Sequence, residues 1–226
     1  MGKVIIFDSG TLISLSMNGL FVEIRRLKEI FKGKFIITRE VKEEIIDKPL
    51  KTKRFELEGL KLKQLLDEKV LELPLSLGIS DKEIDKKTNE IVNIANSTFI
   101  AKGKEIHIID SGEASCLALS EILNKKKIEN VIAVDERTTR ILGERPENLE
   151  KLFRRKLHTK IKSKRENYRF FKGFKFIRSA ELVYVVYKKN LIRLESTALL
   201  DALLYAVKFK GCSISDKEIV EIKKIG

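Results

Sequence analysis

Short runs of β-branched residues alternate along this chain with stretches of helical periodicity, and this alternation restricts the fold more than any other feature. Such alternation is typical of parallel strands joined by crossover helices. The chain has 226 residues, of which 43% are hydrophobic, so it is large enough to bury a sizeable core. We therefore expect an α/β protein with a central parallel sheet. The predicted strands are Val4–Phe7, Phe35–Ile37, Val70–Leu73, Val131–Val134 and Phe174–Ile177.

Several predicted helices begin at a side chain that can cap their first turn. Thr38 can cap a helix in which Val41 and Ile45, four residues apart, face the core. Three further helices open with capping boxes. These are Ser80-x-x-Glu83, Asp110-x-x-Glu113 and Ser215-x-x-Glu218.

Positive charge is concentrated in one segment of the chain. The net charge is +13, and residues 151–178 hold twelve Lys or Arg against one acid, Glu166, which gives this segment +11. Six aromatic residues lie among these cations. Cations that can meet phosphates, beside rings on which unpaired bases can stack, favour a single-stranded nucleic acid as partner. The alternative is a solvated basic face whose aromatic residues belong to the core.

The binding hypothesis selects cations and rings from the middle of this segment. The candidates are Arg154, Arg155, Lys156, Lys160, Lys162, Lys164, Arg165, Arg169, Phe170 and Phe171.

Acidic residues occur where predicted strands end. Asp8 follows the first strand and Asp135 the fourth. The carboxyl ends of parallel strands lie at one edge of a sheet, and ligands bind there. A helix that leads into a strand must start at this same edge, which brings Glu113 beside the two aspartates. Each acid also has a plainer interpretation, as a turn former or as part of a capping box.

A fourth acid comes from the helix that Thr38 caps. Glu44 lies about 60° around the helix axis from Val41 and flanks the buried face, whereas Glu43 lies about 200° away and faces solvent. Glu44 is therefore the preferred candidate and Glu40 the second.

Four carboxylates on one edge, Asp8, Glu44, Glu113 and Asp135, would repel one another or take up protons unless a cation lies among them. Oxygen ligands without His or Cys suit Mg²⁺ or Mn²⁺. This pattern predicts metal-assisted hydrolysis of a phosphodiester, with the four acids as metal ligands and catalytic residues.

The sequence resembles a known family at this point. VIIFDSGTLISL, TREVKEEI, DSGEASCLALSEI and VIAVDERTTRIL, in this order, resemble the four successive motifs of PIN-domain ribonucleases, with an archaeal-type basic insertion and C-terminal extension. The resemblance covers residues 3–142 and resumes weakly at FKFIRSAELVYVVYKKNLI. It implies a three-layer α/β/α fold and metal-dependent RNA cleavage that leaves 5′-phosphate and 3′-hydroxyl ends. It also implies the same four acids as site residues, and Arg140 at a commonly basic position.

The resemblance divides the chain into three parts. We expect a PIN-like nuclease core over residues 1–143, a basic insertion over 144–173, and a final strand with C-terminal helices over 174–226 that completes the domain.

Other functions stay open at this stage. An RNA-binding module with an inactive cleft, a toxin ribonuclease of a toxin–antitoxin pair and a flap nuclease acting on DNA are the alternatives, and a homodimer is not excluded. No run of apolar residues is long enough for a membrane span, and no signal peptide is present, so we expect a cytoplasmic protein. Cys116 and Cys212 lack metal spacing and are expected to be reduced, packed thiols. A single glutamine, Gln64, among many Lys and Glu is typical of a thermophile.

Overall fold

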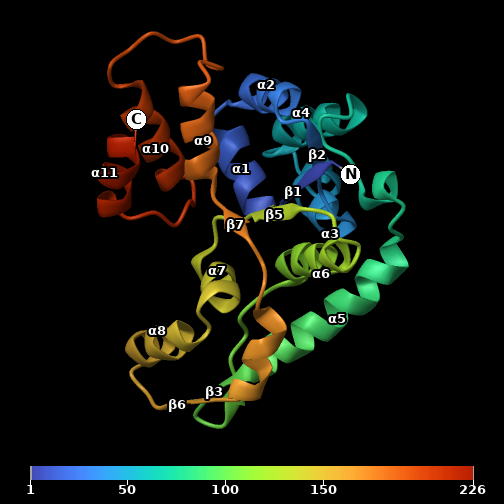
Figure 1. Cartoon of the computed structure of the whole chain (residues 1–226), viewed down its shortest axis with the longest axis vertical. Helices are drawn as coiled ribbons and strands as arrows, with labels where there is room; N and C mark the ends of the chain where they lie inside the picture. Colours follow the sequence, from blue (N-terminus) through green and yellow to red (C-terminus); the bar gives the residue numbers. More distant parts are fainter. Residues whose placement is uncertain (1, 226) are drawn as a thin grey trace.

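A computed structural model describes residues 2–225 and shows a three-layer α/β/α fold (Figure 1). The central sheet is parallel, and its strand order is β2-β1-β5-β7. These strands are β1 (Lys3–Phe7), β2 (Gly33–Ile36), β5 (Asn130–Ala133) and β7 (Phe176–Ile177). The predicted parallel sheet and four of its five strands are confirmed, with ends displaced by one or two residues.

The third predicted strand, Val70–Leu73, is wrong. Glu72 forms a single bridge to Ile36, in which the Glu72 N–H donates to the Phe35 carbonyl at 2.8 Å and the Ile37 N–H to the Glu72 carbonyl at 3.0 Å. The stretch is too short to continue, because Lys69 before it has a positive φ of 58° and Pro74 after it opens a 3₁₀ turn. Proline also has no N–H to donate to a ladder.

Helices cover both faces of this sheet. In the first half of the chain they are α1 (Ser9–Met17), α2 (Phe21–Ile30), α3 (Arg39–Lys42), α4 (Glu56–Asp67) and α5 (Asp81–Thr98). In the second half they are α6 (Ser111–Lys125), α7 (Arg137–Glu144), α8 (Glu147–Leu157), α9 (Ser179–Lys188), α10 (Leu199–Phe209) and α11 (Asp216–Ile225). A π-helical turn, Glu43–Asp47, continues α3, and 3₁₀ turns occupy Pro49–Lys51, Pro74–Leu77 and Arg165–Phe171.

The predicted caps form in the structure. The Thr38 hydroxyl accepts a hydrogen bond from the Val41 N–H at 3.3 Å. The Ser80 hydroxyl accepts one from the Glu83 N–H, also at 3.3 Å. The boxes of α6 and α11 close as well, with Glu113 accepting from the Asp110 N–H at 3.1 Å and Glu218 from the Ser215 N–H at 2.8 Å.

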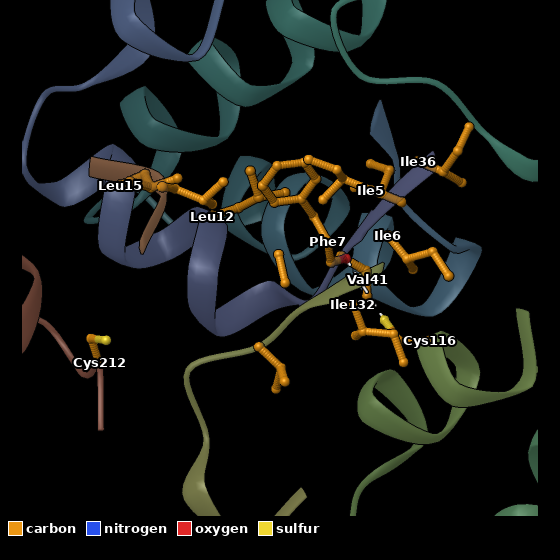
Figure 2. Close-up of a cluster of buried hydrophobic side chains, with 14 of the residues drawn as sticks. Ile5, Ile6, Phe7, Leu12, Leu15, Ile36, Val41, Cys116, Ile132 and Cys212 are labelled. Atoms are coloured by element: carbon orange, nitrogen blue, oxygen red, sulfur yellow. Dashed lines mark hydrogen bonds between the residues drawn. The ribbon is translucent and has the colours of Figure 1, made fainter. Parts of the chain in front are cut away.

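The core fills both sides of the sheet (Figure 2). Phe7 of β1 packs edge-on against Phe35 of β2 with ring centroids 5.1 Å apart, and Leu12 of α1 lies beyond it. Cys116 of α6 lies near Ile132 and its thiol is 3.7 Å from the Phe7 carbonyl oxygen. Both cysteines are buried and free, as predicted.

A second, smaller sheet forms far from the first. It consists of β3 (Phe99–Ala101), β4 (Lys104–Glu105) and β6 (Ile161–Ser163), all antiparallel. Figure 1 shows it at the far end of α5, below the main sheet. Residues 144–173 therefore do not fold alone, because β6 pairs with β3. We call β3, β4, α8, β6 and the 3₁₀ turn Arg165–Phe171 the basic lobe.

The hydrophobic core continues into the basic lobe, where aromatic rings form its centre. The Phe99 ring lies 5.6 Å from the ring of Phe153 and 5.9 Å from that of Tyr168, measured between centroids. Phe171 and Leu149 are fully buried beside them. Asn167 fastens the 3₁₀ turn to the end of α5 through a 3.1 Å hydrogen bond.

Within residues 2–225, no helix is both long enough and apolar enough to cross a membrane.

Candidate functional site

Asp8 lies where the two central strands of the sheet end. Its N–H donates to the Ala133 carbonyl of β5 at 2.9 Å, and its Oδ2 accepts from the Gly10 N–H at 3.2 Å to cap α1. The side chain is buried, with 4% of the residue exposed. Its Oδ1 has no hydrogen-bond partner in the described part of the chain. A buried carboxylate oxygen without a partner is costly, so this position needs an explanation beyond helix capping.

The environment of Asp8 disfavours its charged form. Burial and, after it, the negative charges of Glu113 and Glu44 together raise the pKa of Asp8 from 3.8 to about 7. Hydrogen bonds from the Gly10 and Ser9 backbone act in the opposite direction but do not compensate. Three of the four predicted acids therefore share one electrostatic environment. Such perturbed groups are concentrated at functional sites.

Glu113 is held at both carboxylate oxygens. One accepts from the Asp110 N–H at 3.1 Å, and the other from the hydroxyl of Thr139 on α7. Burial raises the pKa of Glu113 despite these two hydrogen bonds. The contacts with Asp110 and Thr139 both orient the Glu113 carboxylate. Glu113 can therefore cap α6 and also take part in a site at the sheet edge.

Glu44 points toward the start of α6, whereas Glu43 points to solvent. A Cβ atom added to Gly112 would lie 3.0 Å from Glu44 Oε1 and 3.1 Å from Oε2. Any larger residue at position 112 would crowd the Glu44 carboxylate. The side chain of Glu43 is 53% exposed, and that of Glu40 is bound by Arg39 at 3.1 Å. These positions agree with the angular argument from the sequence.

Asp135 lies at the same edge but among different neighbours. Its Oδ1 accepts from the Ser179 N–H at 2.7 Å, and its Oδ2 is buried without a partner among residues 2–225. Burial raises the pKa of Asp135, and the charge of Glu181 adds to this. Asp135 is not among the groups that shift Asp8, so the structure gathers three acids closely and leaves the fourth beside α9.

These acids do not form a finished metal cage. Within residues 2–225 no three His, Cys, Asp or Glu side chains converge closely enough to hold an ion as they stand. Mg²⁺ usually keeps several waters and takes only one or two carboxylates, so a complete cage is not required. The unpartnered oxygens of Asp8 and Asp135 and the raised pKa of Asp8 are what a cation would relieve. The all-oxygen donor set fits Mg²⁺ or Mn²⁺.

Two neighbours of the acids escaped the sequence prediction. Thr139 follows Asp135 by one helical turn and binds Glu113, and Ser179 begins α9 and binds Asp135. The first could have been found from its helical position on the predicted helix after Asp135. The second lies beyond the basic segment, and no local pattern links it to the edge.

The predicted cations are mostly at the surface, in two different settings. Arg140 lies on α7 near the acids and donates to the Ser213 carbonyl at 3.1 Å. The others belong to the basic lobe, where Lys164 is partly buried and the rest are exposed. They are Arg154, Arg155, Lys156, Lys160, Lys162, Lys164, Arg165 and Arg169. Ion pairs join Arg154 and Arg165 to Glu150, and Lys164 to Glu105.

Phe170 and Phe171 have opposite surroundings. Phe170 is 39% exposed and the Arg169 guanidinium lies 5.1 Å from its ring centroid. Phe171 is 1% exposed, so its prediction as a base-stacking residue is wrong. Its side chain, like that of Phe153, is needed to fill the lobe, which otherwise has few large apolar groups. Phe171 and Phe153 therefore belong to the hydrophobic core, as the alternative interpretation of the basic segment expected.

No protein family model matches this chain, and neither a curated protein nor a solved structure matches it. A functional assignment therefore depends on the chemistry of the sheet edge and of the surfaces around it.

Proposed function

We propose that this protein is a Mg²⁺- or Mn²⁺-dependent endoribonuclease. The observation that carries the proposal is the buried Asp8 carboxylate. One of its oxygens accepts no hydrogen bond from residues 2–225, and its pKa is raised to about 7 by burial and by Glu113 and Glu44. A protein that needed Asp8 only to cap α1 would have no reason to gather two more carboxylates beside it. The resemblance of the motifs to PIN-domain ribonucleases supports the same assignment.

The chain's own residues have separate roles in this proposal. Asp8, Glu44, Glu113 and Asp135 would hold the metal, and Thr139 keeps Glu113 oriented toward the edge. When bound, the cation supplies a water of lowered pKa and stabilises negative charge that develops on the phosphate.

The start of α3 is kept in place by a second contact. The Thr38 and Ser115 hydroxyls lie 2.6 Å apart and join α3 to α6, on which Glu113 stands. This contact fixes the two helices that carry Glu44 and Glu113 relative to each other.

Single-stranded RNA is the proposed substrate, because exposed cations extend over the basic lobe and Arg137, which is also exposed, follows Asp135 by two residues. We place the protein in the cytoplasm, where RNA is present and buried thiols stay reduced.

The test is cleavage of labelled single-stranded RNA with Mg²⁺, with Mn²⁺ or with a chelator. We expect cleavage only with metal, leaving 5′-phosphate and 3′-hydroxyl ends. Asp8→Asn should reduce the cleavage rate at least about a hundredfold. Even residues that only hydrogen-bond to metal ligands commonly change activity by about 10–100-fold when they are replaced. Glu43→Gln, which removes an exposed carboxylate from the same helix, is the matched control and should retain its rate. Undiminished cleavage by Asp8→Asn would remove Asp8 from the site.

A second candidate is an RNA-binding module that does not cleave. It is favoured by the absence of a ready three-ligand cluster within residues 2–225. In that case RNA would bind equally well with metal or chelator, and no condition would yield products.

A further inference from the structure

A cavity of about 760 Å³ opens between α7, α8 and the segment that joins α10 to α11. Its wall contains five cationic side chains and a single acidic one, Glu218. The cations are Arg137, Arg140, Lys151, Arg155 and Lys208. Like charges that share a cavity repel one another unless an anion lies between them.

Acids already present do not neutralise this wall. The Glu218 carboxylate is bound by Arg178 at 2.6 Å and by Ser215, and these partners lower its pKa to about 2. It is therefore a satisfied anion with little left for the cavity. Of the five cations, Lys208 pairs with Asp216 at 2.5 Å.

The other four have no carboxylate partner in the described part of the chain. Arg137, Lys151 and Arg155 form no ion pair there. Arg140 donates one hydrogen bond to the Ser213 carbonyl at 3.1 Å, and its buried Nε has no acceptor among residues 2–225. A guanidinium N–H that is buried without an acceptor is one that an incoming anion would satisfy.

The cavity is joined to the acidic edge through Asp135. The Ser213 N–H, on the cavity wall, donates to the Asp135 carbonyl at 3.2 Å. Arg137 is only two residues from Asp135 along the chain. A polyanionic strand in the cavity would thus continue directly to the proposed site of cleavage.

We propose that this cavity binds backbone phosphates of the RNA strand, next to the phosphodiester that lies at the acidic edge. The proposal rests on the proposed function for the identity of the strand, and on the cavity's own charges for the binding. The cations of α8 fall into two groups. Arg155 and Lys151 line the cavity, whereas Arg154 and Lys156 do not.

The α8 helix provides matched controls. Arg155 and Lys156 are neighbours, both are exposed, and neither has an acidic partner in the part of the chain that the structure describes. Arg155→Gln and Lys156→Gln therefore remove the same charge from the same helix, but only the first removes it from the cavity. Arg154→Gln is a second control, in which the lost cation had Glu150 as its partner at 2.9 Å.

The measurement is the dissociation constant for a single-stranded RNA oligomer, prepared once with a 5′-hydroxyl and once with a 5′-phosphate, in chelator, at several salt concentrations. We expect Arg155→Gln and Lys151→Gln each to weaken binding on the order of tenfold, because each removes a charge-assisted contact to phosphate. Each should also reduce the slope of log affinity against log salt by about 0.7. Lys156→Gln and Arg154→Gln remove lobe cations that lie outside the cavity, so they should weaken binding by only about twofold, clearly less than either cavity variant.

Two results would overturn the proposal. One is an equal loss in Arg155→Gln and Lys156→Gln, which would mean that affinity follows the total charge of α8. The other is a loss of affinity that occurs only with oligomers that carry a 5′-phosphate. This would mean that the cavity binds a terminal phosphate and not the backbone phosphates. Because the assay contains no metal, its outcome is independent of whether the acidic edge cleaves RNA.

Discussion

The acids at the edge of the large sheet and the cations of the basic lobe differ in their exposure to solvent. Asp8 and Asp135 are almost completely buried, and burial is the largest cause of the raised pKa of each. Arg155, Lys156 and Lys160 are exposed to solvent on the basic lobe. Charges at the edge act over short distances in a low dielectric, whereas charges on the lobe are screened by salt.

This difference indicates how the two regions contribute. A buried carboxylate destabilises the metal-free protein and becomes favourable only with a proton or a cation, which suits chemistry at a fixed point. An exposed cation costs the fold little and adds a modest, salt-dependent attraction, which suits capture of a long polyanion. The comparison predicts that changes at the edge alter stability with pH and metal, and that changes of lobe cations alter affinity with salt.

The largest expected effect is the pH dependence that Asp8 imposes on the metal-free protein. Its pKa is about 7 in the folded state against 3.8 ordinarily, so between these values the unfolded chain loses a proton that the folded chain keeps. The free energy of unfolding should therefore fall as pH rises through this window, by roughly 4 kcal/mol from Asp8. Asp8→Asn lacks this contribution. The measurement is denaturant unfolding in chelator at pH 4 to 8. The free energy of unfolding of Asp8→Asn relative to that of the wild type should increase as pH rises. A difference that stays constant with pH would contradict the burial argument.

A second comparison lies within the basic lobe itself. Phe171→Ala should lower the free energy of unfolding by about 3 kcal/mol, because it empties a position in the lobe's hydrophobic centre. Phe170→Ala should leave the free energy of unfolding nearly unchanged. It should weaken the binding of single-stranded RNA by about 1 kcal/mol or more, because a stacking ring is lost. Denaturant unfolding and RNA titration of the two variants measure both effects. Equal destabilisation by both changes would show that Phe170 is part of the core.

A smaller effect ranks the acids that follow Thr38. Glu44→Gln should slow metal-dependent cleavage by about tenfold or more, since its carboxylate lies over Gly112 beside Glu113. Glu40→Gln should be milder and Glu43→Gln close to wild type. Rates at saturating RNA give the ranking. If Glu43→Gln were the slowest, the side chains after Thr38 would have to be turned relative to their observed positions.

Local signals in the sequence were sufficient for the four strands of the main sheet and for the positions of Asp8 and Asp135 just after two of them. Strands rich in Val and Ile, and caps such as Thr38, depend on neighbours a few residues away, and strand ends in a parallel sheet necessarily share one edge. Glu44 could be preferred over Glu43 from α-helical phase alone, although both residues lie in the π-helical turn Glu43–Asp47.

Features that depend on distant pairing could not be predicted in the same way. The pairing of β3 with β6 joins very short strands from separate parts of the chain, and neither has a periodic pattern. Phe171 and Phe170 are adjacent and chemically identical, so only the packing around Phe99 determines which one is buried. The extended stretch at Val70–Leu73 has strand-like residues but is limited by turns on both sides.

The central claim, that carboxylates at the sheet edge hold a divalent cation, is tested most directly by calorimetric titration of Mn²⁺ at pH 8. At this pH Asp8 is largely ionised, so proton release does not mask binding. We expect the wild type and Glu43→Gln to bind with the same affinity and Asp8→Asn to bind at least about tenfold more weakly. Binding of Mn²⁺ by Asp8→Asn as tightly as by the wild type, or no binding by the wild type, would contradict the claim.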